Sequence, residues 1–260
     1  MLLMRFLAVL VTILGFGFQT SQGYAQQVVR VVGYTFPPFV VKEGAGGLTT
    51  EFLDFLNTQQ SDFRFEFTKA PPNRRYWAFQ EKHVDLILFE MPEWGWHEYK
   101  PLFDETRVLL RGGEVYITQA KEGRGQAYFD DIKGKHIVGV FGYHYGFAGF
   151  ENDQQWLEKN FSIILTDDPK NVLTMVLKER ADVGVVTQSY LSQYLAQNPD
   201  ATKALLISKK KDQEYRLRAL IGKHAPITIA QFEAMLEKLK KSDALKKFFN
   251  SKGLGNRLAF

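Results

Sequence analysis

Short apolar runs and amphipathic helical stretches alternate along most of this chain. The run VVRVVGY, at residues 28–34, is rich in β-branched residues and ends at the turn-like FPPF. Next, Leu48, Phe52, Phe55 and Leu56 fall on one face of a predicted helix. The strand-like FRFEFT, a helix that opens after PPN, and the strand-like VDLILF complete this first series. Because strands alternate with helices, the pattern predicts an α/β fold with mostly parallel sheets covered by helices on both faces.

The alternation breaks at residues 92–114, where proline, glycine and aromatic residues are mixed. We interpret this stretch as a segment that crosses between two parts of the molecule. A second series follows, with strands at EVYIT, HIVGVF, FSIILT and ADVGVV and predicted helices over 146–160 and 169–180. YRLRALIG has the composition of a returning strand, and an amphipathic helical region then ends at Gly253.

The first 25 residues have the features of a signal peptide. Arg5 supplies a positive charge, residues 6–18 form an apolar run, and Gly23 and Ala25 occupy the small-residue positions before a cleavage site. The run is short for a membrane span, so we expect residues 1–25 to be removed during export; an uncleaved N-terminal anchor is the alternative. No later stretch of the sequence is long and apolar enough to cross a bilayer.

The chain contains no cysteine. Disulfides, thiolate metal sites, a cysteine nucleophile and a lipid on an N-terminal cysteine are therefore excluded. We expect the exported protein to be free in the periplasm, with secretion to the medium as the alternative. Removal of residues 1–25 takes away one arginine, so the formal net charge of +4 becomes +3. The basic residues of the C-terminal third stand between apolar helical positions without aromatic partners, which favours a solvated helix face over a nucleic-acid surface.

Five segments carry a resemblance to a known family: GYTFPPFV, GLTTEFLDFL, PPNRRYWAFQEKHVDLILF, HIVGVFGYHYG and VLKERADVGVVTQSYL. In order and spacing they resemble the family-3 extracellular solute-binding proteins, the type II periplasmic proteins that serve polar amino acid ABC transporters. The likeness covers nearly all of residues 28–250. It implies two lobes with mixed, mostly parallel sheets, a two-strand hinge, and C-terminal helices that fold back onto the first lobe. It assigns residues 26–112 and 216–260 to the first lobe and 113–215 to the second.

The expected ligand site lies in the crevice outside the carboxyl ends of the strands, because loops and helix N-termini converge there in parallel α/β sheets. The loops that follow the predicted strands supply its candidates. The candidate ligand-binding residues are Tyr34, Phe36, Phe39, Arg74, Arg75, Glu90, Met91, Trp94, Trp96, His97, Tyr143, His144, Tyr145 and Thr187.

Two of these positions have more than one expected role. Phe36 lies where the resemblance implies an aromatic ring that stacks on the ligand; the alternative is that Phe36 and Phe39 fill the lobe surface. Glu90 follows the strand VDLILF, where the resemblance implies a small hydroxyl residue. Its carboxylate is expected to meet a cationic group of the ligand, to pair with Arg74 or Arg75 across the cleft, or to face water.

The pattern departs from the amino-acid binders at the ligand clamp. By spacing, His97 stands near the arginine that the resemblance implies for the α-carboxylate, and Thr187 stands where the ammonium-binding aspartate would be. His144 and Tyr145 replace a threonine pair that also meets the carboxylate. Histidine cannot supply the two-pronged hydrogen bonding of arginine, so an anion would depend on the arginine pair after PPN and on the helix N-terminus after Tyr145. If His97 or His144 must be charged for this, affinity should fall above about pH 6.5.

Aromatic residues dominate the predicted cleft, notably Trp94, Trp96, Tyr143 and Tyr145. Aromatic walls suit flat or methylated-cation ligands. The alternative is that one or two of the tryptophans pack the hinge. Three of the five histidines lie in or near these loops, but no pair has helical ligand spacing, so we expect neither a metal nor a cofactor.

These features predict a monomeric, non-catalytic protein that binds a small amino-acid-like, charged or aromatic solute for an ABC transporter or a sensor. Residues around Gly112, Gly113 and 211–216 are expected to bend as the lobes close. The alternative is a periplasmic enzyme resembling the cyclohexadienyl dehydratases, with Glu90 as general acid and an arginine holding a substrate carboxylate. No nucleophile–base pair or phosphate loop supports it. A larger sensor or murein-cleaving enzyme is not expected, because the chain ends at Phe260 with no appended domain.

Overall fold

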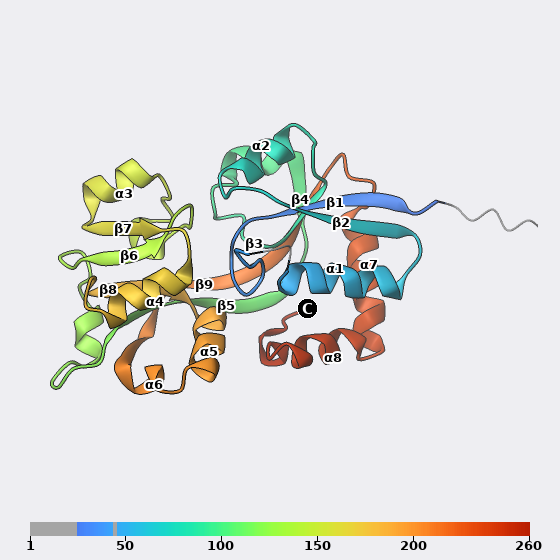
Figure 1. Ribbon diagram of the computed structural model, residues 1–260. Coiled ribbons are helices and arrows are strands. Elements are labelled where there is room, and N and C mark those ends of the chain that lie inside the picture. Colours follow the sequence, from blue (N-terminus) through green and yellow to red (C-terminus); the bar gives the residue numbers. More distant parts are fainter. Residues whose placement is uncertain (1–24, 44–45) are drawn as a thin grey trace, which may run out of the picture.

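Parallel strands form the centre of the first lobe in the computed structural model, which describes residues 25–43 and 46–260 (Figure 1). The middle strand, β1, pairs in parallel with β2 on one side and with β3 on the other. The apolar side chains of Val29, Val31 and Leu86 on these strands are fully buried, which is why the β-branched runs form them. The elements are β1 (Gln27–Gly33), α1 (Leu48–Gln59), β2 (Phe63–Lys69), α2 (Arg74–Gln80) and β3 (Leu86–Glu90).

A second set of parallel strands forms the other lobe, where β6 lies between β7 and β8. The predicted continuous helix over 146–160 is wrong, because Gly149 and Phe150 have positive φ angles of 65° and 66°, which stop a right-handed helix. A short 3₁₀ helix, η3, and a separate α3 replace it. The elements are η2 (Gln126–Phe129), β6 (Ile137–Val140), η3 (Gly146–Ala148), α3 (Gln154–Asn160), β7 (Ile163–Thr166), α4 (Pro169–Leu177), β8 (Val183–Thr187), α5 (Gln188–Gln197) and α6 (Ala201–Ala204).

Two long antiparallel strands, β5 (Leu110–Gln119) and β9 (Leu205–Gly222), run between the lobes (Figure 1). The strand order is β2-β1-β3-β9-β5-β8-β6-β7, and β4 (Phe103–Glu105) also pairs with β9. The register of β5 against β9 shifts beside Glu114 and Val115, and such bulges let a strand bend locally. The predicted crossing segment contains η1 (His97–Leu102), β4 and the start of β5.

The returning strand begins earlier than the sequence predicts. β9 starts at Leu205, whereas the pattern YRLRALIG begins at Tyr215. The early part contains the exposed Lys209 and Lys210, and within the described residues it pairs with β5 alone. Its exposed side chains explain why the composition does not predict a strand there.

The C-terminal helices pack on the first lobe beside α1 (Figure 1). α7 (Ile229–Lys241) begins with a capping box between Thr228 and Gln231, and α8 (Ala244–Ser251) and η4 (Gly255–Arg257) follow it. The buried Phe249 ring lies 5.3 Å from the Phe52 ring of α1. Gly253, with a φ of 69°, ends this region as predicted. The implied return of the C-terminal helices onto the first lobe is confirmed.

The predicted signal peptide lies almost entirely in residues 1–24, outside the described residues. In the part of the chain that the structure describes, no helix is long and apolar enough to cross a membrane. The residue boundaries given above for the two lobes stay predictions.

Candidate functional site

A buried ion pair lies at the inner end of the first lobe. Arg75 is in the first turn of α2 and Glu90 is the last residue of β3, so the helix start and the strand end bring them together. The Arg75 Nε and Glu90 Oε2 atoms are 3.3 Å apart, and the side chains are 0% and 1% exposed. The guanidinium carbon lies 4.3 Å from the centre of the Tyr34 ring and 4.2 Å from that of Tyr76. These ring faces and the carboxylate replace the water that a buried guanidinium loses.

This pair decides among the roles expected for Glu90. The expected pairing with Arg75 is present, although within the first lobe and not across the cleft, and the carboxylate does not face water; contact with a cationic group of the ligand stays a prediction. Burial raises the pKa of Glu90 to about 7, although the Arg75 charge opposes the shift. The Glu90 carboxyl therefore titrates near neutral pH.

His144 brings the second lobe against this pair. Its Nε2 atom lies 2.9 Å from Tyr76 Oη, 3.4 Å from Arg75 Nη2 and 3.2 Å from Asn152 Nδ2, and its Nδ1 atom lies 2.6 Å from the Phe150 carbonyl oxygen. Because a carbonyl only accepts, we assign the ring proton to Nδ1, which leaves Nε2 as an acceptor. Burial, with the Arg75 charge, lowers the pKa of His144 to about 4. A neutral His144 does not supply the positive charge on which the conditional pH dependence of anion binding rests, and that pH dependence stays a prediction.

Gln213 links the lobes through a second hydrogen-bond network. Trp94 Nε1 donates to Gln213 Oε1 at 2.8 Å. Gln213 Nε2 donates to Glu114 Oε2 at 2.8 Å and also to the His144 carbonyl oxygen. Trp94 follows β3 in the first lobe, whereas Glu114 and Gln213 lie on the connecting strands β5 and β9. Side chains of both lobes and of the connecting strands thus meet at one point.

A small cavity of about 10 Å³ remains at this point, enough for about one water molecule. Phe36 is central to its wall, because its ring centre lies 5.6 Å from that of Trp94 and 5.5 Å from that of Tyr143. We call this cavity and its lining the central cleft. It is lined by Tyr34, Phe36, Trp94, Glu114, Tyr143, His144, Gln213 and Tyr215.

The architecture matches solved structures over most of the chain. The GluR0 ligand-binding core from Nostoc punctiforme in complex with L-glutamate is 16% identical, with a TM-score of 0.64 over 86% of this chain and 98% of that one. The substrate binding protein of an amino acid ABC transporter is 16% identical, with a TM-score of 0.62 over 86% and 98%. A histidine kinase sensor domain with similarity to periplasmic binding proteins is 14% identical, with a TM-score of 0.64 over 87% and 96%.

The chain has the two-lobe fold of the type II periplasmic binding proteins. The fold class predicted from the sequence is confirmed. No protein-family model matches the chain, and no curated protein sequence matches it.

Within this binding-protein fold, the structure brings several predicted site residues together. Each of them either lines the central cleft or packs directly behind its wall. These residues are Tyr34, Phe36, Arg75, Glu90, Trp94, Tyr143 and His144. Phe36 lines the cleft and stacks on Phe39 at 5.0 Å, and its expected stacking on a ligand stays a prediction.

Other predicted residues have structural roles beside the cleft. Trp96 is fully buried against the Tyr76 ring, with ring centres 4.9 Å apart, and Met91 is buried in the core. Tyr145 donates its hydroxyl to the Val140 carbonyl oxygen at 2.8 Å. Phe39 packs between Phe36 and Phe89, and Thr187 caps α5 and donates to the Pro37 carbonyl oxygen at 3.3 Å.

Two candidates lie outside the cleft. The side chain of Arg74 is exposed and lies over the Trp77 ring at 5.7 Å. His97 is exposed at the start of η1. Neither side chain lines the central cleft, and their expected contact with a ligand stays a prediction.

The sequence interpretation missed Glu114, Gln213 and Tyr215. Glu114 is 1% exposed, and burial, followed by the nearby Asp212 carboxylate, raises its pKa to about 8. One signal was available: Glu114 follows the Gly112–Gly113 pair at the predicted hinge and begins the apolar strand EVYIT. A carboxylate at the start of a buried strand is uncommon enough to mark a functional position.

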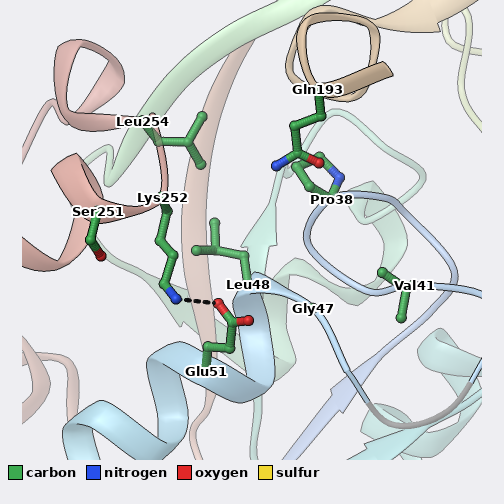
Figure 2. Close-up of a pocket in the computed structure, with 9 residues that line it drawn as sticks. All are labelled: Pro38, Val41, Gly47, Leu48, Glu51, Gln193, Ser251, Lys252 and Leu254. Atoms are coloured by element: carbon green, nitrogen blue, oxygen red, sulfur yellow. Dashed lines mark ion pairs between the residues drawn. The ribbon is translucent and has the colours of Figure 1, made fainter. Parts of the chain in front are cut away.

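A larger pocket of about 390 Å³ lies away from the central cleft, between α1, α5 and the end of α8 (Figure 2). Glu51 and Lys252 form an ion pair at its side, with an O–N distance of 2.9 Å. The first backbone N–H groups of α1 are already used, because Leu48 N donates to the Pro38 carbonyl oxygen and Thr49 N to that of Phe39. In the described part of the chain, no group of three His, Asp or Glu side chains is arranged to hold a metal ion.

Proposed function

We propose that this chain is a solute-binding protein that closes its two lobes around a small polar molecule, either amino-acid-like or another charged or aromatic solute. The observation that carries the proposal is the central cleft, where polar and aromatic side chains of both lobes and of β5 and β9 meet. Such a convergence of polar groups and rings in a cleft between two lobes is typical of small-molecule sites. Similar structures include a ligand-binding core in complex with L-glutamate and the substrate binding protein of an amino acid ABC transporter.

Lobe closure is the proposed mechanism. Tyr143 of the second lobe donates to the Thr35 carbonyl oxygen of the first at 3.1 Å, and His144 faces Tyr76. A ligand that contacts both lobes stabilises the closed state by the contacts that it makes only there. Bending at the bulge beside Glu114 would open the lobes, in agreement with the predicted hinge.

The cellular setting is part of the proposal. Residues 1–25 direct export, and the mature protein is free in the periplasm as a monomer, since no cysteine is present for a lipid anchor. It delivers its ligand to an ABC transporter or presents it to a sensor; a transporter protein and a kinase sensor domain are both among the similar structures. The protein binds without chemical turnover.

The test uses residues 26–260, unfolded and refolded to remove any bound solute. Thermal shifts are measured against amino acids, amines, quaternary ammonium compounds, carboxylates and aromatic acids. At a hundredfold excess over Kd, binding adds about 2.7 kcal/mol to the free energy of unfolding, which raises Tm by roughly 5 °C. Small-angle scattering should then show a smaller radius of gyration, and NMR should show the solute unchanged after prolonged incubation. If no solute of the panel binds, or if the bound solute is converted, the proposal is wrong.

A further inference from the structure

The acidic side chains at the central cleft are compensated to different degrees. Arg75 and Glu90 compensate each other at 3.3 Å, and His144 is neutral at pH 7. The Asp212 carboxylate accepts hydrogen bonds from Tyr116 Oη and from the backbone N–H groups of Gly146 and Phe147. Glu114 is the remaining acid.

Glu114 is buried with little to replace its hydration. Its side chain is 1% exposed and accepts one hydrogen bond, from Gln213 Nε2 at 2.8 Å. Among the described residues, no lysine, arginine or histidine forms an ion pair with it. The Tyr215 hydroxyl lies beside this carboxylate, is itself buried, and has no well-formed hydrogen bond within the described residues. Because this burial raises its pKa to about 8, Glu114 keeps its proton at neutral pH in the ligand-free protein, and it becomes a carboxylate there only when a positive charge lies beside it and the proton leaves to solvent.

Aromatic rings line the same cavity as Glu114. The Trp94 and Tyr215 rings meet edge to face at 5.2 Å, and Phe36 contacts Tyr143 at 5.5 Å. Ring faces attract cations, and a carboxylate beside them adds to the attraction. The chain holds its own Arg75 by such a combination, with the rings of Tyr34 and Tyr76 and the carboxylate of Glu90. The cavity at Glu114 likewise combines aromatic rings with an acidic side chain, but no cationic side chain of the described residues forms an ion pair there.

We propose that the central cleft binds a small organic cation, an amine, guanidine or quaternary ammonium compound, whose positive charge lies against Glu114 and the rings of Trp94, Tyr143 and Tyr215. This inference rests on the proposed binding function and adds the ligand class. The cation takes the place of the Gln213 amide at Glu114, and the cavity of about 10 Å³ must enlarge by partial opening of the Trp94–Gln213 contact. A ligand carboxylate finds no free arginine here, because Arg75 is paired with Glu90.

The experiment compares cations with neutral molecules of the same shape, by isothermal titration of ligand-free residues 26–260. The pairs are choline with 3,3-dimethyl-1-butanol, butylguanidine with butylurea, and benzylamine with benzyl alcohol; glutarate and benzoate serve as anions. Glu114→Gln removes the ability to form a carboxylate against the ligand cation and keeps the shape. Glu214→Gln is the matched control, because Glu214 is a neighbouring β9 residue that is 77% exposed and paired with Lys211 outside the cleft. Thermal melting verifies that each variant is folded.

At least one cation should bind about thirtyfold or more tightly than its neutral counterpart, since loss of one partner of a buried charge pair has an effect of this size or larger. Glu114→Gln should abolish that preference, and Glu214→Gln should leave it unchanged. Equal affinity for cation and neutral partner, or a preference that survives in Glu114→Gln, overturns the inference. If an anion or neutral molecule binds most tightly and closes the lobes, the ligand class is wrong but the binding function stands. If neither this panel nor the wider solute panel binds, both proposals fail.

Discussion

Replacing Glu114 by glutamine should flatten the dependence of stability on pH. The carboxyl lies on β5, 1% exposed, and burial raises its pKa from 4.5 to about 8. The unfolded chain loses this proton near pH 4.5, whereas the folded protein keeps it to about pH 8. The folded state thus binds more protons between these values, so this contribution to stability is fully present below pH 4.5 and is lost as the pH rises towards 8.

The size of this change in stability follows from the width of the pH range in which the folded and unfolded states bind different numbers of protons. Stability changes by about 1.4 kcal/mol for each pH unit in which the two states differ by one proton. From pH 5.5 to pH 7, Glu114 should therefore lower the free energy of unfolding by about 2 kcal/mol. Glu90 and His144 also have shifted pKa values, but they are common to both proteins and cancel in the comparison. The Asp212 carboxyl, whose pKa burial also raises, interacts with Glu114, so the difference between the two proteins measures the effect of this pair of acids.

Urea unfolding of ligand-free protein at pH 5.5, 6.2, 7 and 7.7 measures this difference. The free energy of unfolding of Glu114→Gln should decline less with pH than that of the wild type, and the variant should be the more stable protein at the highest pH. Glu214→Gln, which removes an exposed carboxylate, should follow the wild type. Parallel curves for wild type and Glu114→Gln would show that Glu114 does not retain its proton on folding, and would refute the reasoning.

Two further predictions concern the lobes and the ion pair. Gly142→Ala should hinder closure, because a Cβ atom there would lie 2.6 Å from Pro72 Cβ of the other lobe; we expect weaker ligand binding and a larger radius of gyration. Gly149→Ala is the control, because Gly149 has a similar positive φ but open space around it. If Gly149→Ala loses as much affinity as Gly142→Ala, the steric clash with Pro72 is not the cause of the loss. Arg75→Met should destabilise the protein by about 3–5 kcal/mol, because it leaves a carboxylate buried alone. The double variant Arg75→Met/Glu90→Gln should recover a large part of this loss in urea unfolding; additive losses would mean that the pair does not interact.

The sequence predicts the architecture well because each lobe is built from local alternation. β-branched runs at Val29, Val31 and Val183 are buried strands, and the amphipathic stretches between them are helices. The start of β9 escapes prediction because Lys209 and Lys210 are exposed along it, so that no apolar pattern marks the strand.

The site is predicted only in part, and the arginine pair shows why. Arg75 has Ala78 and Phe79 at helical spacings of three and four, whereas Arg74 has Trp77 and Ala78, so apolar periodicity alone does not separate the two. In the structure Arg75 is buried and Arg74 is exposed. Which arginine is buried behind the wall of the cleft depends on how a seven-residue helix packs on its sheet, which is a tertiary property.

Glu114 was missed for a related reason. Its burial depends on the pairing of β5 with both β8 and β9, and on Trp94 and Gln213 that cover it from distant parts of the chain. Glu114 and Gln213 are about a hundred positions apart in the chain, so neither the spacing of motifs nor the periodicity of apolar residues predicts their contact.

The lysines at the free side of β9 have a consequence for the behaviour of the protein in solution. A strand that pairs on one side only offers its remaining N–H and C=O groups to any extended chain, which is a common start of aggregation. In this part of β9 the Gln126 amide of η2 occupies two of these groups, since its Nε2 donates to the Ile207 carbonyl oxygen at 2.9 Å and its Oε1 accepts from the Lys209 N–H at 2.7 Å. Lys209 and Lys210 are also exposed here, and their like charges repel the same segment of a second molecule. The amide cap and the two lysines together disfavour edge-to-edge pairing between molecules at this strand.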